Sequence, residues 1–312
     1  MSIRRPQFGE LFRRRPISIK TREAIAGYLF ISPWIIGFLI FVLGAMVASL
    51  GISLFETNLL NKTEFVGLAN YQKAFQDKLF WKSLSVTTYY TVAVVPLQTI
   101  AALLIALLLN QKLRGLGFFR TTYYLPSMVT SIALISVWWW MFNPELGLIN
   151  AALAKIGISP GPNWLLSEMW AMPAIILMTV WGSGGSMLIF LGGLQGIPYE
   201  LHEAAMIDGA GSLRRFRHIT IPMLSPIILF SLVIGMIGSF QVFNASYLLT
   251  SGGPNNATLT YVLFLYRRTF EGLQFGYGSA LAWILFAIIL VITLLLFRSS
   301  NLWVYYETEL RK

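Results

Sequence analysis

The sequence predicts an all-α, polytopic membrane protein with six transmembrane helices. Of its 312 residues, 56% are hydrophobic and 12% are charged, whereas an ordinary soluble domain is about a quarter charged. A spanning helix needs about 20 mostly apolar residues. Six runs without Asp, Glu, Lys or Arg are long enough to provide one, at residues 24–55, 83–111, 121–144, 169–199, 219–266 and 272–297.

Three of these runs need comment. The first is too long for a signal peptide and lacks a small-residue cleavage site, so we expect a retained helix. In the fourth, the small residues of WGSGGS at 181–186 either allow close helix packing or line a cavity. The fifth is too long for one helix. The turn-forming sequence SGGPNN at 251–256 ends it, which places the helix at about 223–249.

Lysine and arginine are distributed unevenly among the segments that join the predicted spans. The two tails and the segments 110–120 and 195–222 hold 16 of them, whereas the other three segments hold 7. Because positive residues favour the cytoplasmic side, both termini are expected in the cytoplasm and the chain in the plasma (inner) membrane. The predicted domains are a basic tail at 1–24, a six-helix domain at 25–298 and a cytoplasmic tail at 299–312.

A polar, charged segment separates the fourth and fifth spans. Pro198 suits the first turn of a helix, and Glu200 and Glu203 follow where negative charge favours the helix dipole. Gly209 and Gly211 supply the left-handed or open backbone that ends such a helix.

A second short helix is expected through the sequence LRRFRHI. Ser212 is in a position to cap it, and Pro222 then begins the next span. The segment 198–222 is therefore a predicted hairpin of two helices at the membrane surface. It either presents charge to a soluble partner or covers lipid headgroups.

The hairpin resembles the cytoplasmic loop shared by permease subunits of ATP-binding-cassette (ABC) importers, in the carbohydrate-uptake group that includes maltose and glycerol-phosphate systems. That loop has the pattern EAA, three residues, G, nine residues, I-x-L-P. Here Ile221 stands where the pattern prefers Leu, and the other positions match: Glu203, Ala204, Ala205, Gly209, Ile219 and Pro222. Further segments resemble such permeases in the same order: FVGLANY at 65–71, YYLPSMV at 123–129, FNPELGLIN at 142–150 and LLTSGGPNNAT at 248–258.

The resemblance implies the type I ABC importer permease fold and a transport subunit that is not itself an enzyme. In the family this loop docks as a coupling helix into a cleft of the ATPase subunit. The implied partners are a second permease subunit, two cytoplasmic ATPase subunits that bind ATP and magnesium, and an external solute-binding protein that delivers a sugar. The implied ATPase-docking residues are Glu203, Ala204, Ala205, Asp208, Gly209, Ile219 and Pro222.

The predicted spans contain no Asp, Glu, Lys, Arg or His. Such groups mark proton relays and ion sites, so energy for transport is expected to come from outside the chain. An ion-coupled secondary transporter of a neutral solute, using backbone carbonyls of broken helices, is the alternative. A membrane enzyme would need reactive groups clustered at one depth, but His202 and His218, the two histidines, both lie in the hairpin.

Other apparent motifs are incomplete. His202 and Glu203 begin as in the zinc motif HExxH, but Met206 occupies the second histidine position. No GxxxxGK[ST] phosphate-binding loop occurs, so this chain is not expected to bind ATP, and no cofactor of its own is predicted. Zero cysteines exclude disulfides and Cys-ligated metals. The net charge of +10 is spread over loops and tails that face lipid headgroups, which does not indicate nucleic-acid binding.

A neutral polar patch in the fifth span is the candidate substrate path. Phe240, Asn244 and Tyr247 are expected to share one helical face, with Gln241 beside them. Amides and hydroxyls beside aromatic rings suit an uncharged sugar, because they bond its hydroxyls and cover its ring faces. Bonding of these groups to neighbouring helices is the alternative. The GGP turn that follows is either structural or a contact with the external binding protein.

Overall fold

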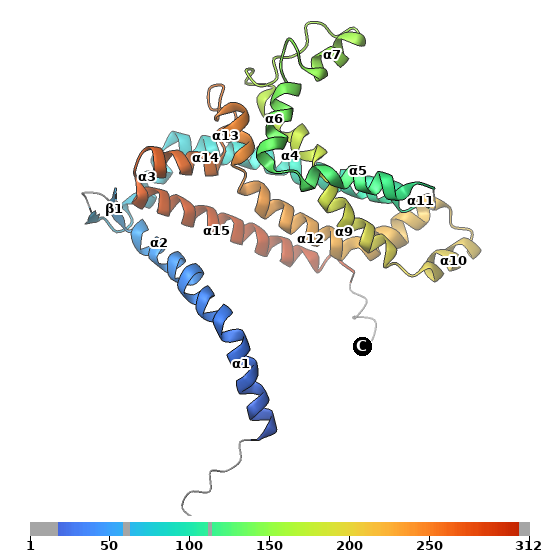
Figure 1. Ribbon diagram of the computed structural model, residues 1–312, viewed down its shortest axis with the longest axis horizontal. Helices are drawn as coiled ribbons and strands as arrows, with labels where there is room; N and C mark the ends of the chain where they lie inside the picture. Colours follow the sequence, from blue (N-terminus) through green and yellow to red (C-terminus); the bar gives the residue numbers. More distant parts are fainter. Residues whose placement is uncertain (1–17, 59–62, 112–113, 306–312) are drawn as a thin grey trace, which may run out of the picture. The chain divides into compact units, whose positions relative to one another are not determined.

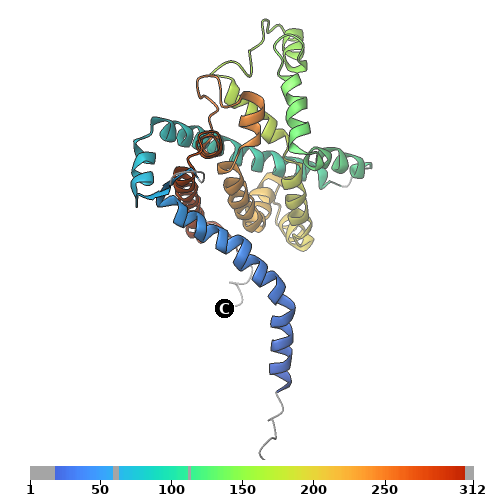
Figure 2. The ribbon, with the colours of Figure 1, turned by 60° about the vertical axis from the view of Figure 1, so that its left-hand side comes forward.

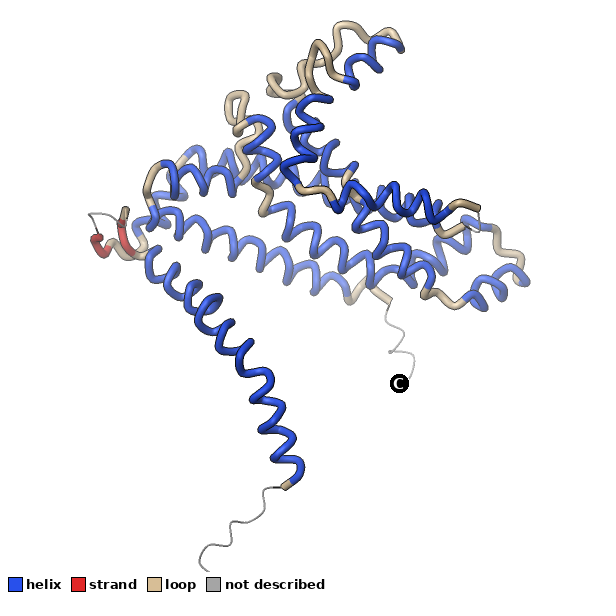
Figure 3. Tube along the Cα trace, in the orientation of Figure 1, coloured by secondary structure: helices blue, strands red, loops and turns tan. Residues whose placement is uncertain are grey.

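The computed structural model describes residues 18–58, 63–111 and 114–305, and its regular structure is almost entirely helical (Figures 1 and 3). Within these residues, four helices are long and apolar enough to cross a membrane, and two bent helix pairs would make six spans if each pair is one span. The multi-span α-helical fold is therefore confirmed, while the count of six stays a prediction. Most of the predicted tail at 1–24, and residues 306–312 of the other tail, lie outside the described residues.

The chain divides into two units, Met1–Ile52 and Ser53–Lys312. The first predicted span is a single apolar helix of 35 residues. Its consecutive parts are α1 (Ile19–Gly37), the π-helical segment η1 (Phe38–Gly44) and α2 (Ala45–Ser53).

The second unit begins with a small structure that the sequence reading did not predict. The strands β1 (Phe55–Thr57) and β2 (Thr63–Phe65) pair antiparallel, and α3 (Ala69–Gln76) follows them. The side-chain amide of Asn70 donates hydrogen bonds to the carbonyls of Ser53 and Phe55, both at 2.9 Å. These two bonds tie α3 to the chain that enters β1.

Helix α4 (Lys78–Leu109) is the central helix of the second unit. It begins five residues before the predicted start at 83, because the carboxylate of Asp77 accepts a hydrogen bond from the Leu79 N–H at 2.8 Å and caps the helix. Its buried side chains enter all three hydrophobic clusters of the unit. Helices α9 and α12 pack against α4, and α15 packs against α12 (Figures 1 and 2).

The third and fourth predicted spans are each broken into two helices. The expectation of one helix at 121–144 is wrong, because the chain bends by 100° where Val129 and Thr130 adopt extended backbone. Pro126, three residues earlier, also removes one helical N–H donor. The fourth span bends by 43° at Gly182 and Ser183. The four helices are α5 (Leu116–Met128), α6 (Ser131–Met141), α8 (Ala171–Trp181) and α9 (Gly184–Gln195), with α7 (Leu148–Lys155) between the pairs.

The WGSGGS sequence serves both roles that were left open. A side chain at Gly184 would collide with the backbone carbonyl of Tyr123, so this glycine allows α9 to approach α5. Ser186, two residues later, lines a cavity.

The fifth predicted span also differs from expectation. Its helix ends at Phe240 rather than near 249, and a new helix begins at Asn244. The sixth predicted span, 272–297, is confirmed as one helix. The elements after α9 are α10 (Tyr199–Ile207), α11 (Ser212–Arg215), η2 (Phe216–Thr220), α12 (Ile221–Phe240), α13 (Asn244–Thr250), α14 (Tyr261–Tyr266), η3 (Arg267–Glu271) and α15 (Phe275–Ser300).

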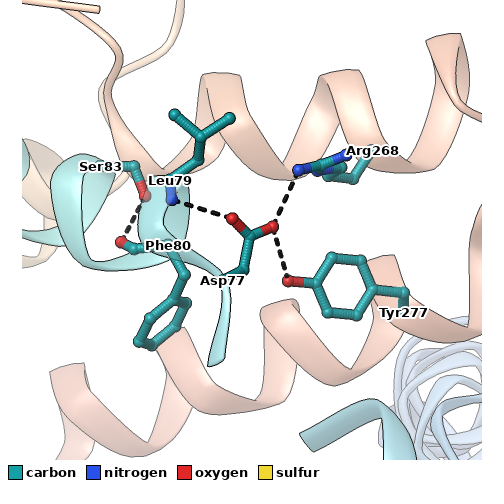
Figure 4. A network of polar contacts seen from close by, with 6 residues as sticks. All are labelled: Asp77, Leu79, Phe80, Ser83, Arg268 and Tyr277. Carbon is teal, nitrogen blue, oxygen red and sulfur yellow. Dashed lines mark hydrogen bonds and ion pairs between the residues drawn. The ribbon is translucent and has the colours of Figure 1, made fainter. Parts of the chain in front are cut away.

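A polar network joins α4, η3 and α15 at one end of the bundle (Figure 4). The second carboxylate oxygen of Asp77 accepts a hydrogen bond from the Arg268 guanidinium at 2.8 Å and lies 3.4 Å from the Tyr277 hydroxyl, which donates to it. The Lys73 ammonium lies over the Tyr277 ring, 5.0 Å from its centroid. Asp77, Arg268, Tyr277 and Lys73 therefore form one contact network at this end.

Candidate functional site

The hairpin at 198–222 is built around a glycine turn. Helix α10 ends at Ile207, and Gly209 adopts a left-handed backbone with φ of 79°. The Gly209 N–H donates to the Met206 carbonyl at 3.0 Å, and the Ala210 N–H donates to the Ala205 carbonyl at 2.8 Å. These two bonds form a Schellman motif, which needs a residue without a Cβ at the left-handed position. The motif explains the spacing of four residues between Ala205 and Gly209.

The second half of the hairpin differs from expectation in two ways. Ser212 makes no capping hydrogen bond, and Gly211 occupies the cap position with φ of −65°. The helix that begins at Ser212 does not stop before Pro222. It continues through η2 into α12 as one helix of 29 residues ending at Phe240. The hairpin is therefore joined to a membrane span by continuous helix rather than through a turn.

The predicted ATPase-docking residues fall into two groups by exposure. Glu203, Ala204, Asp208 and Gly209 are exposed, on α10 and the turn after it. The other three are half-buried: Ala205 lies on α10, and Ile219 and Pro222 lie where the hairpin meets α12. The exposed group is the part of the predicted site that another protein reaches without any rearrangement.

Two apolar side chains at the hairpin tip were missed by the sequence reading. Ile207 is 87% exposed and Leu213 is 80% exposed, one on each side of the glycine turn. Tyr199 and Met206 add further exposed apolar surface on α10. The signal was available in the sequence, because Ile207 and Leu213 flank the polar sequence DGAGS inside a loop that cannot bury them.

A second candidate site is a cavity of about 280 Å³ between α4, α8, α9 and α12. At one wall the Tyr90 hydroxyl bonds to the Thr179 hydroxyl at 3.0 Å, and Thr179 in turn donates to the Ile175 carbonyl at 2.9 Å. Among the residues that the structure describes, no charged side chain lines the cavity. Its polar lining consists of Tyr90, Gln98, Thr99, Thr179, Ser186, Ser231 and Ser239.

The four predicted substrate-path residues do not line this cavity, although their neighbours Ser239 and Val242 do. Their expected common helical face is wrong, because the helix is interrupted between Phe240 and Asn244. Phe240 is buried in the core between α12, α14 and α15.

The other three residues lie in different surroundings. Gln241 lines a mostly apolar groove between α12, α14 and α15. Asn244 donates to the Ser131 hydroxyl at 3.2 Å, which is the helix-to-helix bonding named as the alternative. Tyr247 stacks on Phe243, with ring centroids 5.1 Å apart. A role for these residues in the substrate path stays a prediction.

Comparison with known proteins shows the family. A family model described as "Binding-protein-dependent transport system inner membrane component" matches residues 74–304. The chain belongs to this family. The match runs from α3 through the hairpin to the end of α15, so it includes both candidate sites.

Curated relatives of this permease carry names from ABC and sugar transport. The probable ABC transporter permease protein YesP of Bacillus subtilis (strain 168) is 42% identical over 291 residues, covering 92% of this chain and 94% of that protein. The trehalose/maltose transport system permease protein MalF of Thermococcus litoralis is 37% identical over 278 residues, covering 88% and 94%. The resemblance to carbohydrate-uptake ABC permeases is therefore confirmed.

A solved structure shares the fold. A chain of a bacterial ABC transporter involved in the import of the polysaccharide alginate superposes on this permease with a TM-score of 0.79 at 22% sequence identity, covering 90% of this chain and 97% of that chain. The fold of this permease is that of an ABC importer subunit.

Proposed function

We propose that this permease forms half of the translocation pore of an ATP-driven importer for a sugar or oligosaccharide. A second permease subunit, different or identical, completes the pore, and an external binding protein delivers the sugar. Two cytoplasmic ATPase subunits bind ATP and magnesium and engage the hairpin, with both termini of this chain on the same cytoplasmic side. The family's dependence on binding proteins and the trehalose/maltose relative support this proposal.

The exposed hairpin tip is the observation that carries the proposal. Ile207 and Leu213 expose large apolar side chains in a segment that also carries exposed charges, including Glu203 and Asp208. An apolar centre with a polar rim is typical of a protein docking surface. Because the helix from Ser212 runs unbroken into α12, a partner that moves this tip also moves a membrane helix.

The proposed mechanism follows from that connection. ATP binding closes the two ATPase subunits and draws the docked hairpins of the two permeases together. The rigid helix then transmits the displacement to the pore, which changes between inward-facing and outward-facing states. The exposed carboxylates of Glu203 and Asp208 fix the orientation of docking through charge-assisted hydrogen bonds.

The cavity between α4, α8, α9 and α12 supports a neutral sugar as the substrate. Its hydroxyls and the amide of Gln98 offer hydrogen bonds, its apolar lining covers ring faces, and it holds no charge that would favour an ionic solute. Gly238 lines the cavity and has open space where a side chain would be. We expect Gly238→Leu to lower sugar uptake at unchanged abundance, whereas Gly192→Leu, at an open glycine outside the cavity, leaves uptake normal.

Gentle purification of the tagged full-length chain tests the ATPase partnership. We expect an ABC ATPase to co-purify with it, and we expect Ile207→Ser with Leu213→Ser to abolish that association. The matched control is Leu146→Ser with Leu166→Ser, which removes two equally exposed leucines from the segment between α6 and α8. Retention of the ATPase by the hairpin variant, or solute transport by the chain alone in liposomes, contradicts the proposal. The second outcome would indicate an ion-coupled secondary transporter.

A further inference from the structure

The start of α12 contains two prolines four residues apart, Pro222 and Pro226. In an α-helix the carbonyl of each residue accepts a hydrogen bond from the N–H four residues later. Pro226 has no N–H, so the Pro222 carbonyl lacks its normal donor. This weak point lies where the hairpin motif ends and the membrane span begins.

The side chain of Ser225 supplies the missing hydrogen-bond donor. Its hydroxyl donates a hydrogen bond to the Pro222 carbonyl at 2.6 Å, and Ser225 is only 3% exposed. The same hydroxyl oxygen accepts a hydrogen bond from the backbone N–H of Tyr305 at 2.8 Å. The buried Ser225 hydroxyl therefore links Pro222, the last residue of the hairpin motif, to Tyr305, which lies 80 residues after Ser225 in the chain.

The segment that supplies the Tyr305 N–H is held against the end of α15. The helix ends at Ser300, and the Val304 N–H donates back to the Ser300 carbonyl at 2.8 Å. The Trp303 indole N–H donates to the Ser299 hydroxyl at 3.4 Å. The Ser225 hydroxyl thus joins the start of α12 to the end of α15.

A second serine shows which part of this arrangement is unusual. Ser32 precedes Pro33 in α1, and its hydroxyl donates to the Leu29 carbonyl at 2.8 Å, because Pro33 likewise cannot donate. The local repair is therefore the same at both positions. Ser32 is half-buried and, within the described part of the chain, accepts no hydrogen bond from a distant segment, whereas Ser225 is buried and accepts one from Tyr305.

We propose that Ser225 is a positioning residue that fixes the angle between the hairpin and α12 by holding the Pro222 carbonyl and the Tyr305 N–H together. Helices interrupted by proline bend most easily where backbone bonds are missing. The two bonds at Ser225 replace the missing one and add a connection to α15. If the proposed function holds, this connection makes α12 and α15 move together when an ATPase displaces the hairpin.

Spin-label distances test this inference without any ATPase. The chain has no cysteine, so Ile207→Cys on the hairpin and Leu294→Cys on α15 label two exposed positions. The full-length labelled chain is placed in lipid nanodiscs, and the distance distribution is measured by double electron–electron resonance. We expect one narrow distance with Ser225 intact. Ser225→Ala should give a broad distribution instead, and so should Tyr305→Pro, which removes the N–H donor together with the tyrosine side chain.

Two further variants separate the role of Ser225 from general damage to folding. Pro226→Ala restores the missing N–H but not the link to Tyr305, so Ser225→Ala with Pro226→Ala should narrow the distribution part of the way. Ser32→Ala removes the matched local bond in α1 and should leave the distribution unchanged. An unchanged distribution in Ser225→Ala, or a double variant as broad as Ser225→Ala, overturns the inference. Failure here leaves the ATPase co-purification test intact, because the two measurements share no partner.

Discussion

The two ends of the helical bundle in the second unit differ in the ion pairs that their charged side chains form. At the end formed by α3, η3 and the start of α15, Asp77 caps α4 and pairs with Arg268 at 2.8 Å (Figure 4). At the other end, no ion pair involves a charged residue of α10, α11 or η2 among the described residues. In Figure 1, α10 and α11 lie away from β1 and α3.

This difference separates charges that hold the fold from charges that are available to a partner. A carboxylate that caps a helix and pairs with a partly buried arginine stabilises the folded chain. An exposed and unpaired carboxylate adds little to stability, because water solvates it well in the free chain. Substitutions at the hairpin should therefore change association with a partner, and substitutions at Asp77 should change stability.

The largest expected effect on association with a partner is the loss of the ATPase in Gly209→Trp. A tryptophan cannot readily adopt the left-handed backbone at φ of 79°, and its ring would project from an exposed turn onto the docking surface. We expect co-purification of the ATPase to fall at least about tenfold, which corresponds to about 1.4 kcal/mol of binding free energy. Glu203→Ala, which removes one exposed charge, should weaken association less.

The control for Gly209→Trp is Gly157→Trp. Gly157 is also left-handed, with φ of 88°, and also has open space around it, but it lies in the segment between α7 and α8. Both variants carry the same backbone strain and the same new ring. Equal loss of the ATPase in the two would show that strain, not the hairpin surface, is responsible.

The largest expected effect on stability is at the paired end, in Asp77→Ala. This change removes the cap of α4, the bond to Arg268 and the bond to the Tyr277 hydroxyl. We expect a loss of about 2–3 kcal/mol in the free energy of unfolding, since a cap contributes about 1 kcal/mol and the ion pair is only partly buried. The measurement is the thermal unfolding midpoint of the detergent-purified chain.

Asp77→Asn sharpens the same prediction. Its side-chain oxygen still caps α4, so this variant should be less destabilised than Asp77→Ala. ATPase association of any folded Asp77 variant should stay normal. A stable Asp77→Ala chain that loses the ATPase would remove the distinction between the two ends.

The sequence was sufficient to predict those features that follow from local composition. Runs without charge identify membrane helices because lipid penalises charge wherever it occurs, and α4 and α15 lie where these runs predict them. The left-handed Gly209 follows equally well from its place after an EAA helix, because the Schellman motif is local.

The features that the sequence could not supply depend on contacts between distant segments. The run at 121–144 contains Pro126 but no charged residue and no cluster of turn-forming residues like SGGPNN, so it predicts one helix, although the chain bends by 100° after Met128. Residues 241–243, where the fifth span is interrupted, include no glycine or proline, and the break separates Phe240 from the two residues expected on its face. The link from Ser225 to Tyr305 joins residues far apart in the chain, which no local pattern reports.

The smallest expected effect tests whether exposed charges are indeed neutral for stability. Glu271 lies 4.0 Å from the Arg267 guanidinium, and its side chain is 53% exposed. Glu271→Gln should change the free energy of unfolding by less than about 0.5 kcal/mol, because solvent screens such a pair. Arg267 keeps its hydrogen bond to the Ser251 carbonyl at 2.6 Å, so the loop after α13 stays anchored. If Glu271→Gln instead lowered the unfolding midpoint as much as Asp77→Ala, exposed charges would be structural in this protein. The unpaired charges of the hairpin would then no longer point to a partner, and the argument for docking would depend on Ile207 and Leu213 alone.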